Sequence, residues 1–141
     1  MKRVPIKFIY PVILVMCLGF LFTMIGQPAN YWTDFSKVNE GSPLGFNLLK
    51  INPIYFLIFC LLYLFAMVVL IKKLPFKIGA ILALSLFLGH SYGSSSWVYY
   101  LFQKMGFETS IFSHWYLTIG YLAIISMISV FLVVGKNNPK E

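Results

Sequence analysis

The chain has 141 residues, of which 60% are hydrophobic and only 11% are charged, and its mean hydropathy is +0.83. Soluble domains carry roughly a quarter charged residues, so this composition excludes an ordinary soluble domain and predicts one membrane domain over residues 1–141. The net charge of +7 lies mostly beside long apolar runs and forms no basic stripe with aromatic residues, which excludes nucleic acid as a partner.

The first predicted element is a membrane span over residues 8–25, which follows a short basic lead. This run carries no charge, and as a helix it would be about 27 Å long, enough for one crossing. A secretory signal peptide is the alternative, but the run is long for a signal core and Met24-Ile25-Gly26 lacks the small residues of a cleavage site. We therefore expect an uncleaved span.

A polar link over residues 27–50 follows, and it carries two acidic and two basic residues. Ser42-Pro43 is typical of a helix N-cap followed by proline at the first helical position, so it predicts a short interfacial helix that ends near Leu49. Asn52-Pro53 repeats this pattern and predicts the start of the second span, residues 54–71.

A tight basic turn over residues 72–77 leads into the third predicted span, residues 78–102. This run is long enough for a tilted continuous helix or for a helix that breaks near Gly93. A second polar link covers residues 103–112, and the fourth predicted span covers residues 113–134. The sequence therefore predicts an all-α fold, a transmembrane bundle of four helices.

The distribution of lysine and arginine predicts the orientation of this bundle. The lead carries three, the turn at residues 72–77 three and the tail two, whereas the links at 27–50 and 103–112 carry two and one. Because basic residues are enriched on the cytoplasmic side, we expect both termini in the cytoplasm and both polar links on the outer side.

The third span contains an unusual run of small and polar residues, Gly-His-Ser-Tyr-Gly-Ser-Ser-Ser, over residues 89–96. Ser85, Gly89 and Gly93 recur every four residues, a spacing that lets a neighbouring helix approach closely, so we predict helix packing there. Gly89 to Gly93 also match G-x-S-x-G, the nucleophile elbow of α/β-hydrolases, but that motif needs a preceding strand and a sheet. We regard this match as accidental.

Packing does not explain His90, because an imidazole inside a membrane needs a partner. It is either a structural side chain bonded to a nearby hydroxyl or carbonyl, or a ligand or proton-handling group that faces an outer pocket. The candidate polar cluster consists of His90, Ser91, Ser94, Tyr99, His114, Asp34, Glu40 and Glu108. Metal and cofactor remain open, since no spacing such as H-E-x-x-H specifies one.

Enzymatic alternatives rest on few residues. A membrane serine protease would use Ser91, Ser94 or Ser95 as the nucleophile and His114 as the base. An ion-coupled pump is disfavoured because no predicted span contains an acidic or basic residue. Cys17 and Cys60 form no C-x-x-C pair, which disfavours a disulfide redox protein similar to vitamin K epoxide reductase, and we expect both thiols to be buried.

Several short motifs lie in the first link and the third span. They are Gln27-Pro28, Tyr31-Trp32, Val38-Asn39-Glu40, Pro43-x-Gly45, Leu48-Leu49, Pro53, Gly89-His90 and Gly93-x-x-Ser96-Trp97. This pattern resembles an uncharacterised group of small bacterial polytopic membrane proteins. The resemblance implies a multi-pass protein of the bacterial cytoplasmic (inner) membrane, in which the outer link and the third span form one unit. It implies no activity.

The sequence thus favours a non-enzymatic accessory or assembly component, whose partners are the lipid bilayer and either other membrane subunits or further copies of itself. The alternative is a small-ligand or metal-binding membrane protein, or a membrane enzyme, that uses the polar cluster around His90. A preformed concavity at His90 lined by Asp34, Glu40, His114 or Tyr99 would favour the alternative. Sealed packing there would favour the accessory component.

Overall fold

The computed structural model describes residues 3–107 and 110–134. The helices are α1 (Tyr10–Ile25), α2 (Pro43–Ile51), α3 (Pro53–Lys73), α4 (Phe76–Lys104) and α5 (Ile111–Val134), with short 3-10 turns η1 (Ile6–Phe8), η2 (Ala29–Trp32) and η3 (Phe35–Lys37). The described residues contain no strand. Helices α1, α3, α4 and α5 belong to four segments that are long and apolar enough to cross a membrane, which confirms the predicted all-α fold with four candidate spans.

The bounds of the four long helices agree closely with those of the predicted spans. The ends of α3, α4 and α5 lie within two residues of the predicted spans, and α1 begins at Tyr10 because the preceding residues form the 3-10 turn η1. Helix α4 runs without interruption through Gly93, so the third span is a continuous helix.

Both predicted caps are present at the ends of α2. The Ser42 side chain accepts a hydrogen bond from the Gly45 backbone N–H at 3.2 Å, and Pro43 occupies the first turn. The Asn52 side chain accepts from the Ile54 N–H at 2.8 Å, and its extended backbone separates α2 from α3. The short helix after Ser42 is therefore confirmed, and its interfacial position stays a prediction.

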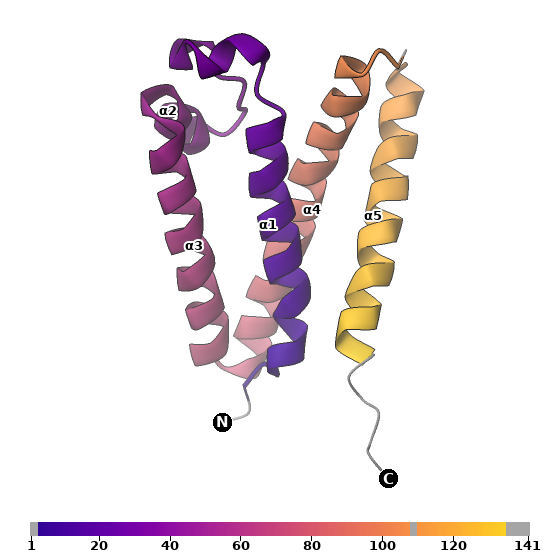
Figure 1. Cartoon of the computed structure of the whole chain (residues 1–141). Helices are drawn as coiled ribbons and strands as arrows, with labels where there is room; N and C mark the ends of the chain where they lie inside the picture. The colour runs from indigo at the N-terminus through magenta and orange to yellow at the C-terminus, as the bar shows by residue number, and fades with distance from the viewer. Residues whose placement is uncertain (1–2, 108–109, 135–141) are drawn as a thin grey trace.

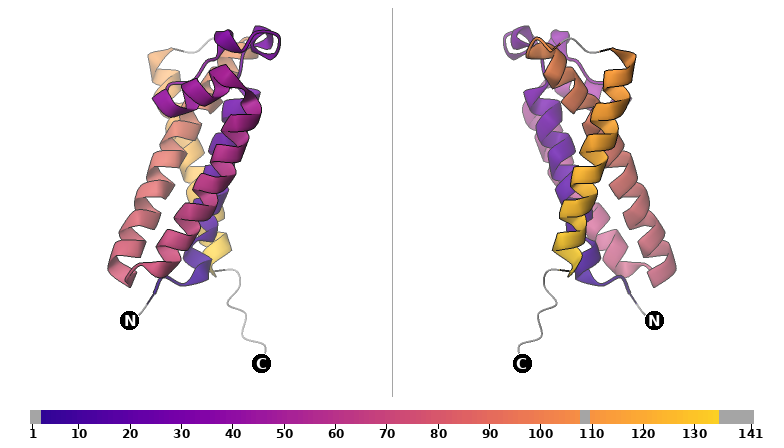
Figure 2. Two further views of the ribbon diagram at one scale, coloured as in Figure 1. Left: turned by 90° about the vertical axis from the view of Figure 1, so that its left-hand side faces the viewer. Right: turned by 90° about the vertical axis from the view of Figure 1, so that its right-hand side faces the viewer.

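The four long helices form an antiparallel bundle (Figure 1). Helix α1 is central and contacts α3, α4 and α5. The α3–α4 turn, the start of α1 and the end of α5 lie at one end of the bundle, which we call the turn end. Helix α2 and the 3-10 turns η2 and η3 lie at the opposite end, the α2 end, as both side views also show (Figure 2).

At the turn end α1, α3 and α4 meet in a closed core. Its buried side chains are Val4, Ile9, Val12, Met16, Ile71 and Ala83. Gly79 lies where α4 leaves the turn, and a Cβ there would stand 2.8 Å from the carbonyl oxygen of Ile71. Only glycine therefore permits this approach of the two backbones.

At the α2 end the link is held to the bundle by one buried glutamine. Gln27 is 1% exposed, and its side-chain amide donates to the Asn39 carbonyl and accepts from the Asn39 N–H, both at 2.9 Å. The same Nε2 donates to the Thr23 carbonyl at 2.9 Å. We call this arrangement the Gln27 clamp, and it anchors the 3-10 turns over the end of α1.

Two further contacts tie the α2 end together. The phenol of Tyr31, which is fully buried, donates to the Leu49 carbonyl in α2 at 2.9 Å; burial raises the pKa of this phenol. The Lys104 ammonium at the end of α4 donates to the Gln27 carbonyl at 3.2 Å. The link is thus bonded to α1, α2 and α4 and forms a fixed cap.

The packing predicted for Ser85, Gly89 and Gly93 is not shown within the described bundle. All three are exposed, and a Cβ at Gly89 or Gly93 would meet nothing within 4 Å, so they make no close helix contact within the described chain. The small residues that are buried on α4 are instead Ser91, Ser94 and Ser95. The contact of the predicted face with another protein stays a prediction.

Of the two cysteines, Cys60 is buried as expected and Cys17 is exposed on α1. The expectation for Cys17 was wrong because an apolar span does not reveal which of its faces meets the bundle.

Candidate functional site

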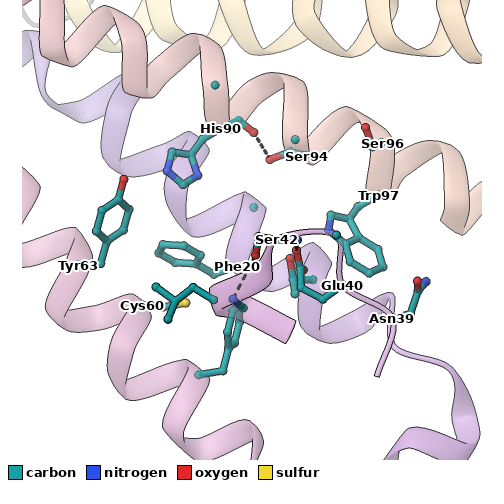
Figure 3. Close-up of a pocket in the computed structure, with 18 of the residues that line it drawn as sticks. Phe20, Asn39, Glu40, Ser42, Cys60, Tyr63, His90, Ser94, Ser96 and Trp97 are labelled. Carbon is teal, nitrogen blue, oxygen red and sulfur yellow. Dashed lines mark hydrogen bonds between the residues drawn. The ribbon is translucent and has the colours of Figure 1, made fainter. Parts of the chain in front are cut away.

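A cavity of about 720 Å³ lies between α1, α3 and α4, under the link and the start of α2 (Figure 3). This volume lies within the range of about 300–1,000 Å³ that is typical of small-molecule sites. The cavity exists because α3 and α4 meet at their turn and separate toward the α2 end (Figure 1).

Helix α3 supplies an aromatic wall to this cavity. Phe56, Phe59, Cys60 and Tyr63 all line it, at positions that share one helical face. The rings of Phe59 and Tyr63 are stacked at 5.9 Å. Phe20 of α1 meets Phe56 edge to face at 6.5 Å, so the wall continues from α3 onto α1.

Helix α4 forms the opposite wall, and its glycines create the space. Gly89 and Gly93 line the cavity and are exposed, so the cavity opens sideways along them. Trp97 also lines the cavity, and its indole lies against Gly26, where any Cβ would collide with the ring. An edge contact with Tyr100 at 5.8 Å further fixes the indole.

His90 lies in the aromatic part of the cavity wall. Its ring is half-buried, edge-on to Phe20 at 5.8 Å and tilted against Tyr63 at 6.0 Å. Among the described residues no hydroxyl or carbonyl bonds its ring nitrogens, although the His90 carbonyl accepts from the Ser94 hydroxyl at 2.6 Å. The first of the two alternatives for His90, an imidazole bonded to a hydroxyl or carbonyl, is therefore not formed within the described chain, and the ring is available to a molecule in the cavity.

Glu40 and Ser42 form a polar rim at the α2 end of the cavity. One carboxylate oxygen of Glu40 accepts the Ser42 N–H at 2.8 Å, while the Ser42 hydroxyl caps α2. A Cβ at Gly45 would lie 3.0 Å from the Glu40 side chain, so this carboxylate is held beside the first turn of α2. The positive end of the helix dipole favours a carboxylate at such a position.

The predicted polar cluster is brought together only in part. His90, Ser94 and Glu40 line one cavity. Tyr99 and His114 pack on each other at 4.6 Å and line no part of it. Ser91 is fully buried, and its hydroxyl has no hydrogen-bond partner in the described chain.

The acidic members of the predicted cluster also separate. Asp34 is exposed and caps the turn η3 by accepting the Ser36 N–H at 2.9 Å. Hydrogen bonding by the Ser36 side chain, and then by its backbone N–H, lowers the pKa of this carboxyl. It does not line the cavity. Glu108 lies outside the described residues. No three metal-ligating side chains come together in the described part of the chain.

No hydrogen-bonded pair of a serine and a histidine side chain among the described residues supports the serine protease hypothesis. The hydroxyls of Ser94 and Ser95 donate to the His90 and Tyr92 carbonyls at 2.6 and 2.7 Å, within their own helix. His114 packs on Tyr99 instead of bonding a serine among the described residues. A nucleophile of this class needs a base within hydrogen-bond reach.

The chain matches no family model, no curated protein and no solved structure. The site is therefore defined by its own geometry. The aromatic wall is not among the predicted features, although Phe56, Phe59 and Tyr63 are spaced on one helical face. The Gln27 clamp is not among them either, because no local sequence pattern indicates it.

Proposed function

We propose that this protein binds a small amphipathic molecule within the membrane, in the cavity between α1, α3 and α4. The observation that carries the proposal is the cavity itself, which has an aromatic wall at Phe56, Phe59 and Tyr63 and a polar rim at Glu40 and Ser42. An apolar body with few polar groups suits such a lining. A concavity lined by His90 and Glu40 favours ligand binding over a purely structural subunit.

The surroundings of the cavity support a preformed site. The Gln27 clamp and the Tyr31 hydrogen bond hold the cap in place without any ligand. A site that is rigid before binding loses less conformational freedom on association. The exposed glycines at 89 and 93 leave a lateral opening through which a membrane-dissolved molecule reaches the site.

For the orientation we propose cytoplasmic termini and an outward α2 end in a bacterial cytoplasmic membrane. Eight of the eleven basic residues lie at the turn end or in the terminal segments. A topology reporter fused after Lys50 should report the exterior, and a reporter fused after Lys73 should report the cytoplasm. A cytoplasmic signal at Lys50 would contradict this orientation.

Binding can be tested with N-phenyl-1-naphthylamine, a neutral apolar dye whose fluorescence rises in apolar surroundings. Purified protein in phosphatidylcholine nanodiscs should bind the dye above the background of protein-free nanodiscs. Gly93→Trp fills the cavity from its open wall, because a side chain there has free space to enter. It should reduce dye binding by about tenfold or more.

Gly120→Trp is the matched control. Gly120 lies on α5, is exposed, has nothing within 4 Å of an added Cβ and does not line the cavity. This variant should bind the dye like the wild type. Equal binding by the wild type and both variants would overturn the proposed function.

A second candidate is an accessory component that packs against another membrane helix through the exposed face of α4. The observation that favours it is Tyr92, which is 57% exposed near the middle of α4, where lipid offers its hydroxyl no partner. Tyr92→Leu should then release a co-purifying subunit without changing dye binding. Retention of all partners by this variant would contradict the second candidate.

A further inference from the structure

The cavity has an unbalanced charge. Glu40 is the only carboxylate among its described lining residues, and neither lysine nor arginine takes part. Within the described chain Glu40 forms no ion pair, and its hydrogen bond is the one from the Ser42 N–H. Glu40 is half-exposed at the rim of the cavity, and a positively charged guest in the cavity would be attracted to its carboxylate.

None of the three lysines of the α2 end, Lys37, Lys50 and Lys104, lines the cavity. The Lys104 ammonium donates to the Gln27 carbonyl at 3.2 Å. The Lys50 ammonium stands over the ring of Phe46 at 5.9 Å. Neither lines the cavity, so the positive charge opposite Glu40 is left to the guest.

The aromatic wall is suited to the same kind of guest. Phe20, Phe56, Trp97 and Tyr100 all line the cavity, and the faces of aromatic rings attract cations, tryptophan most strongly. Trp97 lies toward the same end of the cavity as Glu40, whereas Tyr63 and His90 lie toward the other end (Figure 3). A cationic group near Glu40 would thus have aromatic rings beside it, and an apolar body would extend toward Tyr63.

We infer that the guest is an organic cation, an ammonium or phosphonium group attached to an apolar body, with Glu40 as its counter-charge. This inference rests on the proposed function, since it names the chemical class that the same cavity takes. An anionic amphiphile does not suit the site, because it would face Glu40 with no cation in the described lining.

The test compares tetraphenylphosphonium with tetraphenylborate, two ions of the same shape and opposite charge. Each displaces N-phenyl-1-naphthylamine from the full chain in phosphatidylcholine nanodiscs, with concentrations corrected for uptake by protein-free nanodiscs. Tetraphenylphosphonium should act at a concentration about tenfold lower than tetraphenylborate. Equal potency in the wild type would overturn the inference, and this comparison does not depend on any variant being folded.

Two variants test whether Glu40 causes the preference for tetraphenylphosphonium over tetraphenylborate. Glu40→Gln keeps an oxygen for the Ser42 N–H and removes the charge, so the preference for the phosphonium should disappear while the neutral dye still binds. Asp34→Asn is the matched control, since it removes a carboxylate from the same link at an exposed position outside the cavity. It should leave the preference unchanged.

The aromatic contribution has its own pair of variants. Trp97→Leu should raise the phosphonium concentration needed by about threefold, the size of one cation–π contact. Trp115→Leu, on α5 and 58% exposed, should have no effect.

The outcomes separate the two claims. If the dye binds and Gly93→Trp blocks it, but Glu40→Gln leaves the phosphonium preference unchanged, the charge inference is wrong and the proposed function stands. If the dye does not bind the wild type above background, both are wrong.

Discussion

Gly79 and Gly93 lie on the same helix, α4, yet their surroundings differ in one respect, the distance to the next helix. At Gly79 an added Cβ would stand 2.8 Å from the Ile71 carbonyl oxygen, whereas at Gly93 it would meet nothing within 4 Å. The first glycine closes the turn end and the second leaves the cavity open. A small residue in a membrane helix therefore permits close packing, but the position of the neighbouring helix decides whether packing or space results.

The core residues show the same difference between the two ends. Aliphatic side chains such as Ile9, Val12 and Ile71 are buried at the turn end. The α2 end has a second buried cluster of Tyr31, Leu49, Phe56 and Cys60, and Phe56 and Cys60 also line the cavity. The link and the start of α2 cover this end, where α3 and α4 have separated.

The largest effect is expected from Gly79→Leu. The new side chain would collide with the backbone of Ile71, and a backbone cannot move aside as a flexible side chain can. The free energy of unfolding should fall by about 3 kcal/mol, measured by reversible unfolding in detergent. A stability equal to that of the wild type would show that the turn end is not closely packed.

Gln27→Ala should have the next largest effect, because it removes the clamp that supports the open end. The variant leaves the Asn39 N–H and two carbonyl groups without their partner, which should cost about 2 kcal/mol of stability. Binding of the neutral dye should weaken as well.

Gln103→Ala is the control for the clamp. Gln103 is also a glutamine near the α2 end, but it is exposed and donates only to the exposed Tyr99 hydroxyl at 3.1 Å. Its loss should change stability by less than about 0.5 kcal/mol. Equal effects of the two alanine variants would contradict the role of the clamp.

Tyr31→Phe should cost about 1 kcal/mol, since it removes one buried hydrogen bond to Leu49 and keeps the ring. Thermal unfolding compared with Tyr55→Phe measures this, because Tyr55 is 55% exposed. A loss in both variants would indicate a general effect of tyrosine hydroxyls.

Gly93→Leu should have the smallest effect on stability, within about 1 kcal/mol of the wild type, because the side chain enters free space and glycine is a poor helix former. It should nevertheless reduce dye binding. The contrast with Gly79→Leu, which introduces the same residue into the same helix, is the most direct test that α4 is closely packed at the turn end and borders free space at the cavity. Similar stability losses at both positions would remove the distinction.

Most of the fold could be predicted because its determinants are local. An uncharged apolar run marks each span, and Ser42-Pro43 and Asn52-Pro53 mark the helix starts that the structure confirms. These features depend on neighbouring residues only. The continuous course of α4 through Gly93 could not be decided, because a glycine inside a helix is tolerated or disruptive according to its contacts.

The site could be predicted only in part because it depends on which helix faces meet. His90 and Glu40 were named, and they line one cavity. Tyr99 and His114 were named with them, but they pack on each other away from the cavity. In a membrane helix, phenylalanine is common both on surfaces that line a cavity and on surfaces that face lipid. The residue type of Phe56 and Phe59 therefore does not indicate that they line a cavity.

The closed turn end has a consequence for the source of any guest. Helices α3 and α4 are joined by a turn at Leu74 and Pro75, and Gly79 brings their backbones into contact there. On the proposed function, a molecule dissolved in the bilayer would then reach the cavity from the half of the membrane next to α2. Occupancy would then follow the concentration of the guest in one leaflet and would be insensitive to the other, so the protein would distinguish the two leaflets without moving any helix.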